Sequence, residues 1–290
     1  MKHLKPKKVT LFLACLIITG TIEAQDTLTT DTTKAWNSGG LASITFSQLS
    51  FNNWATGGDN SLTGLISLNL FGNYSKNKLD WKNTLDLNMG LIKQGSDQAR
   101  KSDDRFEIAS KLGYKASKYW YYSALLSFRT QFFDGFDPAI SDSSVLISSF
   151  MAPAYIHLSI GMDYQPNKYF SMMVSPLSAR TTLDLNDTLA DRGMFGLKPG
   201  NKALFEIGGY IRFVYKKEVI KNVLLATKLS LFSSYSDHPE NIDVDWENNI
   251  NMVVNKFLTT NFILHLLYDD NVTRRLQVKE VLGVGITYKF

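Results

Sequence analysis

The chain has 290 residues, of which 44% are hydrophobic and 12% aromatic, and it carries a formal net charge of +4. Four lysines and one glutamate in residues 1–24 contribute +3 of that charge, so the remainder is close to neutral. A near-neutral chain lacks the basic surface that a nucleic acid requires, and we expect no nucleic acid partner.

A secretory signal peptide is predicted over residues 1–24. An apolar run over residues 9–19 follows a positive start formed by Lys2, Lys5, Lys7 and Lys8. The run is too short for a transmembrane helix, and Ala24 suits a cleavage site. Cys15, the single cysteine, lies inside this segment. We therefore expect no disulfide and no thiolate metal site in the exported chain.

Residues 25–38 are rich in threonine and aspartate, and we expect them to form a short disordered lead-in. From residue 39 onward, apolar and polar residues alternate with a period of two, the spacing that places them on opposite faces of a strand. The pattern predicts twelve strands, with approximate spans 40–51, 61–74, 78–93, 104–115, 119–133, 152–164, 168–182, 203–215, 220–235, 242–254, 257–269 and 276–290.

The segments between these strands favour a particular all-β fold. Short polar turns alternate with long connections over 94–103, 134–151 and 183–202. Bacterial outer-membrane barrels have short periplasmic turns and long external loops, and a membrane strand needs about 9–11 residues. A soluble sandwich would also alternate, but its strands are shorter. We predict a transmembrane antiparallel up-and-down β-barrel with both termini in the periplasm, embedded in outer-membrane lipid.

The end of the chain supports this prediction. Val284, Ile286, Tyr288 and Phe290 fall on one strand face, and the chain stops on an aromatic residue. This ending resembles the C-terminal sorting signal of outer-membrane barrels. The barrel-assembly machinery is therefore an expected partner during insertion.

A family resemblance extends over most of the exported chain. The first loop, residues 51–61, contains Trp54, Gly57 and Gly58. Together with residues 175–178, 239–242 and 280–290, it resembles a Bacteroidota family of outer-membrane β-barrels known as domain of unknown function 3078. The resemblance implies an outer-membrane location and a barrel, and it brings no substrate and no catalytic residue.

The barrel interior is the shielded space where chemistry could occur, and charged residues of both signs are expected to point into it. We favour a closed barrel with a structural role, in which these charges pair across the interior. The alternative is a narrow polar pore in which facing charges orient a small polar solute. The interior charges are Asp80, Lys82, Asp86, Arg105, Glu107, Lys111, Arg129, Asp163, Glu206, Arg212, Lys228, Asp243, Asp245 and Glu247.

Three of these carboxylates form a column at alternate positions, Asp243, Asp245 and Glu247. Dense oxygen ligands can hold Ca²⁺, but the glycine-bearing turn of a calcium loop is missing. We favour pairing of the column with Lys228 on the preceding strand, and we expect no metal and no cofactor.

A lipid-modifying enzyme on a barrel would need a serine–histidine pair. The available histidines are His157, His238 and His265, and the chain contains no G-x-S-x-G nucleophile sequence. We predict that the protein is not an enzyme.

Two loops carry exposed apolar residues that suggest another function. Trp54, Gly57 and Gly58 lie in the first loop, and Leu146 and Phe150 lie in the connection over 134–151. Such residues can fold into the barrel mouth as a constriction or dock another outer-membrane protein. Docking would make the chain a non-enzymatic component of a secretion or assembly complex.

Overall fold

The computed structural model describes residues 35–50, 59–137 and 145–290. The expected signal peptide, most of the expected lead-in, and the loop residues Trp54, Gly57 and Gly58 lie outside the described residues. All statements below concern the described part of the chain.

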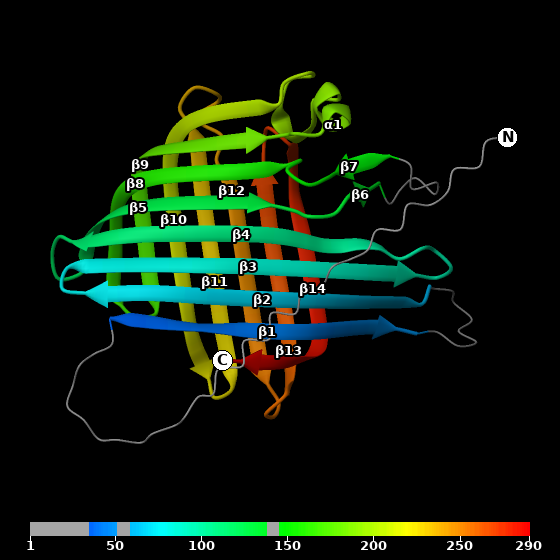
Figure 1. The fold of residues 1–290 in the computed structure, drawn as a ribbon, viewed down its shortest axis with the longest axis horizontal. Helices are drawn as coiled ribbons and strands as arrows, with labels where there is room; N and C mark the ends of the chain where they lie inside the picture. Colours follow the sequence, from blue (N-terminus) through cyan, green and yellow to red (C-terminus); the bar gives the residue numbers. More distant parts are fainter. Residues whose placement is uncertain (1–34, 51–58, 138–144) are drawn as a thin grey trace. The chain divides into compact units, whose positions relative to one another are not determined.

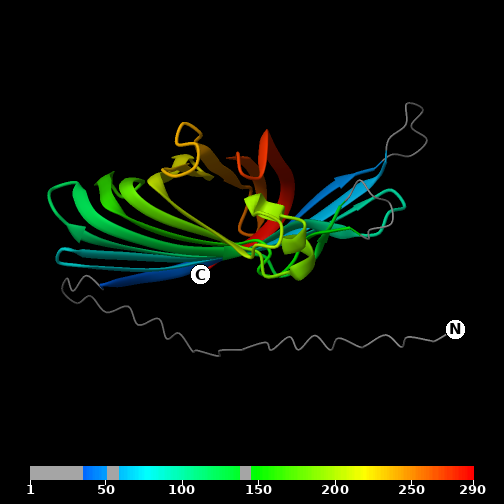
Figure 2. The same ribbon diagram turned by 90° about the horizontal axis from the view of Figure 1, so that it is seen from above.

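Twelve long strands form one closed antiparallel barrel, which confirms the predicted fold class and the strand count. Figure 1 shows β2 to β5 crossing in front of β11 to β14, and Figure 2 shows the two groups facing each other across the interior. The barrel strands are β1 (Trp36–Leu49), β2 (Ser61–Lys76), β3 (Leu79–Gln94), β4 (Arg100–Lys115), β5 (Trp120–Thr130), β8 (Ala154–Asn167), β9 (Phe170–Leu183), β10 (Ala203–Ile220), β11 (Val223–Ser234), β12 (Asp243–Val253), β13 (Leu258–Asp269) and β14 (Thr273–Lys289).

The barrel begins earlier than the expected boundary at residue 39, because β1 starts at Trp36. The Trp36 ring lies 5.3 Å from that of Tyr74 and 5.8 Å from that of Trp81. These aromatic contacts extend the pairing of β1 with β2 to its first residue. The predicted boundary was placed too late because the residues around Trp36 are polar and do not show the apolar alternation of a strand.

The two ends of the barrel have different connections. At one end lie the turns over 77–78, 168–169 and 221–222, together with the start of β1 and the end of β14. Asn77 and Asn222 have φ values of 57° and 66°, in the left-handed region that asparagine tolerates in tight hairpins. The other end, hereafter the loop end, carries the long connections. This arrangement agrees with the predicted alternation of turns and loops.

The connection after β5 forms a separate two-stranded sheet of β6 (Gly135–Phe136) and β7 (Leu146–Ser148). Lys101 ties it to the barrel, because its Nζ donates to Gln131 Oε1 at 2.7 Å, to the Phe133 carbonyl at 2.6 Å and to Ser148 Oγ at 3.2 Å.

The connection after β9 contains a short helix, α1 (Asp187–Asp191), and a 3₁₀ turn, η1 (Met194–Gly196). The side chain of Asn186 caps α1 by accepting from the Leu189 amide at 3.2 Å. Arg192 donates to the Leu146 carbonyl at 2.6 Å, which joins this connection to β7. No helix among the described residues is long and apolar enough to cross a membrane.

The alternation along each strand gives the barrel an apolar outer face and a polar interior. Large apolar side chains on nearly every strand are exposed on the outside, for example Ile44, Ile66, Ile108, Leu158, Ile211 and Ile286. The interior also holds a small apolar cluster, which fills part of its cross-section between β4 and β11. We call it the interior apolar cluster, and it consists of Ala109, Leu125, Met173, Tyr210 and Phe232.

The barrel closes where β1 pairs with β14, and this seam needs glycine. The register pairs Thr45 with Gly285, and the Gly40 and Phe290 backbones exchange hydrogen bonds of 2.8 and 3.1 Å. A Cβ atom on Gly285 would lie 2.3 Å from the Ile44 carbonyl oxygen. A side chain there forces the two strands apart.

We expect Gly285→Ala to destabilise the barrel by about 1–3 kcal/mol, because the added methyl group overpacks the seam. The measurement is the urea midpoint of the lipid-reconstituted protein, followed by tryptophan fluorescence. Gly72→Ala is the matched control, since its Cβ would meet nothing closer than a Trp36 ring carbon at 4.0 Å. Equal midpoints for the two variants would refute the steric argument.

Candidate functional site

Six charged side chains connect opposite walls of the barrel. Arg105 on β4 donates to both oxygens of Glu247 on β12, at 2.7 and 2.8 Å. In the order of the closed sheet, five strands separate β4 from β12 by either route. Arg129 on β5 similarly reaches Asp245 on β12 at 2.8 Å. These contacts therefore span the interior.

The same group is completed by Glu107 and Lys228. The Lys228 ammonium lies 2.9 Å from Glu247 and 3.3 Å from Glu107. Glu107, only 4% exposed, also accepts from Arg105 and from Arg129, the latter at 3.0 Å. We call the set Arg105, Glu107, Arg129, Lys228, Asp245 and Glu247 the lumen lattice. Such buried charges persist because each has at least one opposite charge within hydrogen-bonding distance.

Two further charge clusters lie inside the barrel. In one, Lys111 pairs with Asp163, which is fully buried and also accepts from Ser171 at 2.7 Å. Gln165 connects that pair to the neighbouring Lys82–Asp80 ion pair through bonds of 2.7 and 2.8 Å.

The other cluster centres on Arg180, which lies 2.8 Å from Glu206, 2.6 Å from Asp243 and 3.7 Å from Asp269. Asp86, the remaining expected interior acid, accepts from Asn69 at 2.6 Å. Of the fourteen expected interior charges, Arg212 is the one for which the described residues offer no ion-pair or hydrogen-bond partner.

The interior positions of Arg180 and Asp269 were not predicted from the sequence. Irregular pairing of β9 explains the first omission, because the register with β8 shifts after Ile160. Val174 and Leu177 both face outward across this irregularity, so the odd–even phase reverses and Arg180 turns inward. Strict alternation carries no signal for such shifts. Asp269, by contrast, keeps the odd phase of the inward-facing His265 on β13, so strict alternation is compatible with its interior position.

The acidic column proposed for Ca²⁺ is already occupied by protein cations. Asp243 pairs with Arg180, Asp245 with Arg129, and Glu247 with Arg105 and Lys228. His265 approaches the column as well, with its Nε2 atom 2.9 Å from Asp245. Asp245, Glu247 and His265 could in principle hold an ion together. Any metal would have to displace guanidinium or ammonium groups, which disfavours binding.

The interior histidines do not form a serine nucleophile in reach of a substrate. His157 Nε2 lies 2.6 Å from Ser159 Oγ, but Ser159 is fully buried beneath Ser178, whose hydroxyl donates to it at 2.8 Å. The His157 ring packs on Tyr210 with the ring centres 4.2 Å apart. His238 is exposed in the connection before β12.

A cavity of about 550 Å³ lies between the lumen lattice and the loop end. The lattice residues Glu107, Arg129, Lys228 and Asp245 form part of its wall. Arg180, Arg212, Tyr155, His157, Tyr210 and Phe232 also line it. Near the loop end, Gln131, Ser148 and Phe195 of η1 complete the lining. The cavity is thus a polar chamber with an aromatic side.

The loop residues expected to form a constriction or a dock occupy different positions. The Phe150 ring is 55% exposed and stacks on Phe132, with ring centres 6.3 Å apart. Phe132 packs in turn on the outward-facing Phe106. Phe150 therefore belongs to the outer aromatic surface rather than to the barrel mouth. Leu146 is half-buried in β7.

The C-terminal residues of the expected sorting signal all lie on the outer face. Val284, Ile286, Tyr288 and Phe290 are 49–65% exposed. The Tyr288 and Phe290 rings stack 5.9 Å apart at the end of the seam. Recognition by an assembly machinery stays a prediction.

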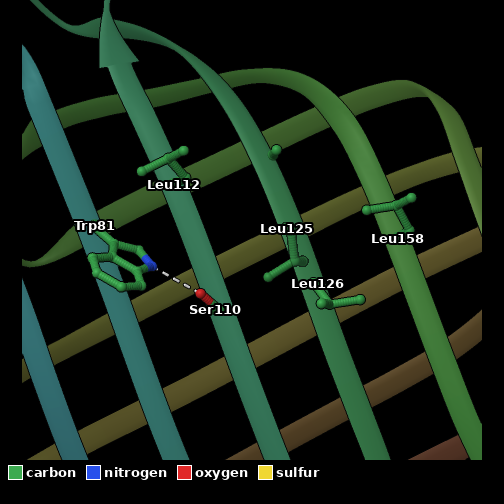
Figure 3. Close-up of a pocket in the computed structure, with 7 residues that line it drawn as sticks. Trp81, Ser110, Leu112, Leu125, Leu126 and Leu158 are labelled. Atoms are coloured by element: carbon green, nitrogen blue, oxygen red, sulfur yellow. Dashed lines mark hydrogen bonds between the residues drawn. The ribbon is translucent and has the colours of Figure 1, made fainter.

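The outer wall also carries a hollow of about 400 Å³ over Ala124, lined by Trp81, Leu112, Leu126 and Leu158. Figure 3 shows the Trp81 indole directed across to Ser110 on the neighbouring strand. Its N–H donates to Ser110 Oγ at 2.8 Å, and that hydroxyl donates to Asn83 Oδ1 at 2.8 Å. Three polar groups on an apolar surface thus satisfy one another.

The same arrangement recurs on the opposite wall. Trp246 donates to Thr227 Oγ1 at 2.9 Å, and Thr227 donates to Asn248 Oδ1 at 2.8 Å. In both cases the tryptophan and asparagine are two residues apart on one strand and the hydroxyl comes from the next. A hydroxyl that both accepts and donates leaves neither the indole N–H nor the amide oxygen unpaired on this apolar surface.

The comparisons with known proteins add a partial family match. Residues 46–136 match a family described as protein of unknown function (DUF3078). This span runs from β1 to β6, so the other segments of the expected resemblance, 175–178, 239–242 and 280–290, lie outside it. The search of curated proteins gave no match.

Several solved structures are similar to this chain. An outer membrane channel from Pseudomonas putida F1 has 10% identity and a TM-score of 0.41, over 90% of this chain and 99% of that one. The translocator domain of the autotransporter NalP from Neisseria meningitidis has 8% identity and a TM-score of 0.38, over 87% of each chain. The NanC porin has 8% identity and a TM-score of 0.38, over 86% of this chain and 100% of that one.

We expect Ser110→Ala and Thr227→Val each to lower the free energy of unfolding in lipid by about 1–3 kcal/mol, because each leaves an indole N–H and an amide oxygen unpaired. Urea midpoints in vesicles provide the measurement. Ser127→Ala is the control, since within the described residues its inward hydroxyl makes no hydrogen bond. If all three variants had the urea midpoint of the wild type, the tryptophan–hydroxyl–asparagine hydrogen bonds would not contribute measurably to stability.

The Asp184 carboxyl, just outside β9, provides a pH test. One of its oxygens accepts from the Asn186 amide at 3.1 Å, and the other has no partner among the described atoms. Burial raises the pKa of Asp184 above its ordinary value. The stability that Asp184 gives to the folded 184–202 connection is therefore fully present below the ordinary aspartate pKa. This stability is lost as the pH rises through the higher pKa of the folded state.

We expect the amides of the 184–202 connection to be better protected from hydrogen exchange at pH 4 than at pH 7, after correction for intrinsic rates. Asp184→Asn should remove this difference, because the amide cannot ionise. Asp191→Asn, at an exposed position in the same connection, should keep it. A difference that survives in Asp184→Asn would assign the pH dependence to another group.

Proposed function

We propose that the protein is a bacterial outer-membrane β-barrel that is closed to ion flow in its resting state. The outer-membrane location is supported by the apolar side chains that cover the outer face of nearly every strand. In water this surface would be far larger than the apolar patches that soluble monomers expose, whereas lipid covers it at no cost. Aromatic residues near the strand ends, such as Trp36, Trp120 and Tyr288, suit the interfacial girdles.

The single observation that carries the closed state is the connection of opposite walls through the lumen lattice. A hydrated ion passing through the barrel has to separate Arg105 from Glu247 and Arg129 from Asp245. These side chains are only partly exposed, so separating the pairs costs free energy that water would not fully restore. The interior apolar cluster obstructs the adjoining cross-section.

The lattice also has a structural role in this proposal. Glu107 contacts three cations, from β4, β5 and β11, so it links the neighbouring strands β4 and β5 to the distant β11. Such links limit breathing of a twelve-stranded barrel. Of the two interpretations of the interior charges, the cross-linked barrel is therefore favoured over a permanently open pore.

We expect refolded wild-type protein to give no discrete conductance steps in a planar lipid bilayer. The quadruple variant Arg105→Ser, Arg129→Ser, Asp245→Ser and Glu247→Ser should give steps whose size depends on salt concentration. This variant removes the Arg105–Glu247 and Arg129–Asp245 pairs. It leaves the net charge unchanged, so it enlarges the interior without changing its overall charge.

Asp80→Asn with Lys82→Gln is the control, because it removes an interior ion pair that joins neighbouring positions on one strand. This variant should stay silent. Gel migration of each variant before and after heating shows whether the protein has folded into a barrel that can insert into the bilayer. Steady wild-type steps of the size that the quadruple variant gives would overturn the proposal and favour an open pore.

A further inference from the structure

The cavity contains one arginine that differs from the other interior arginines. Arg105, Arg129 and Arg180 each contact two or three carboxylates. Arg212 lines the same cavity, yet within the described residues it makes no ion pair and no hydrogen bond. A guanidinium is always charged and offers five donors, so it is the position at which the cavity has unused binding capacity.

The neighbours of Arg212 do not supply a counter-charge. Its cross-strand partners are Met173 on β9 and Ser230 on β11. The four acids that line the cavity, by contrast, are held by other cations. Glu107 and Asp245 lie in the lumen lattice, and Asp243 and Asp269 lie against Arg180. Four cations and four acids line the cavity, and among the described residues Arg212 is the one of these cations without a carboxylate in contact.

Next to this charge lies an apolar surface. Tyr210, two residues from Arg212 on β10, and Phe232 are both nearly buried and belong to the interior apolar cluster. His157 packs on both rings, with ring centres 4.2 Å and 5.8 Å away. The Arg180 guanidinium lies over the Phe232 ring, 4.3 Å from its centre. The cavity thus offers one unpaired guanidinium beside partly covered aromatic rings, and its volume of about 550 Å³ falls in the range of small-molecule sites.

We propose that the cavity binds a small organic carboxylate with an apolar body, with the carboxylate on Arg212 and the apolar body against Tyr210 and Phe232. A carboxylate matches the two parallel donors of a guanidinium. An inorganic anion would satisfy the charge but leave the aromatic side uncovered, and a cation would face Arg212 directly. This site goes beyond the closed-barrel function and does not depend on it, because a dead-ended chamber and an open pore can both bind.

Isothermal titration calorimetry of the detergent-refolded protein tests the site, with benzoate as the probe. We expect saturable binding to the wild type and a loss of affinity of about tenfold or more in Arg212→Gln, the effect of removing one charged hydrogen-bond partner. Arg212→Lys should restore part of the affinity. Lys82→Gln removes an interior cation that does not line the cavity, and it should bind as the wild type does.

Two other probes separate the parts of the site. Benzyl alcohol keeps the ring and lacks the charge, and acetate keeps the charge and lacks the ring, so we expect both to bind at least about tenfold more weakly than benzoate. These comparisons need only the wild-type protein and decide the matter even if a variant fails to fold. Absence of saturable benzoate binding, equal binding of benzyl alcohol, or unchanged affinity in Arg212→Gln would each overturn the proposal.

Discussion

The hydrogen-bonded closure of the sheet is the constraint on which the rest of the molecule depends. Once β1 pairs with β14, no strand edge remains along the seam and each strand has one face outside and one inside. The alternation of apolar and polar residues then becomes a division between an outer surface and a chamber. Gly285 allows this closure, because the approach of Ile44 leaves no room for a side chain.

The interior follows a different rule from the outer surface. Outside, apolar side chains of many shapes occupy equivalent positions, and in the proposed membrane location lipid would accommodate them all. Inside, every expected charge except Arg212 has a partner at a defined distance among the described residues, and in the lumen lattice several partners come from opposite walls. Glu107 illustrates this demand, because its carboxylate is almost fully buried and is compensated by three cations from three strands. The interior is therefore specified far more narrowly than the surface.

The periodicity of the sequence was enough to predict the barrel, its twelve strands and the alternation of its connections. It also predicted which faces of β3, β11 and β12 would carry charge, because the spacing of Asp243, Asp245 and Glu247 is unbroken. It could not predict their partners, since contacts such as Arg105 with Glu247 depend on the stagger of a closed sheet. Arg180 was missed for a local reason, as the irregularity between Val174 and Leu177 reverses the phase of β9.

The pairing of Glu107 with three cations also bears on how such an interior can change over time. Replacing any one member of the lumen lattice removes an ion-pair partner from residues on two or more strands that are distant in the chain. A substitution at a single lattice position therefore disturbs contacts on several strands at once, whereas removal of an acid together with its facing base keeps the charges of the lattice balanced. We therefore expect the six residues to vary together among related barrels.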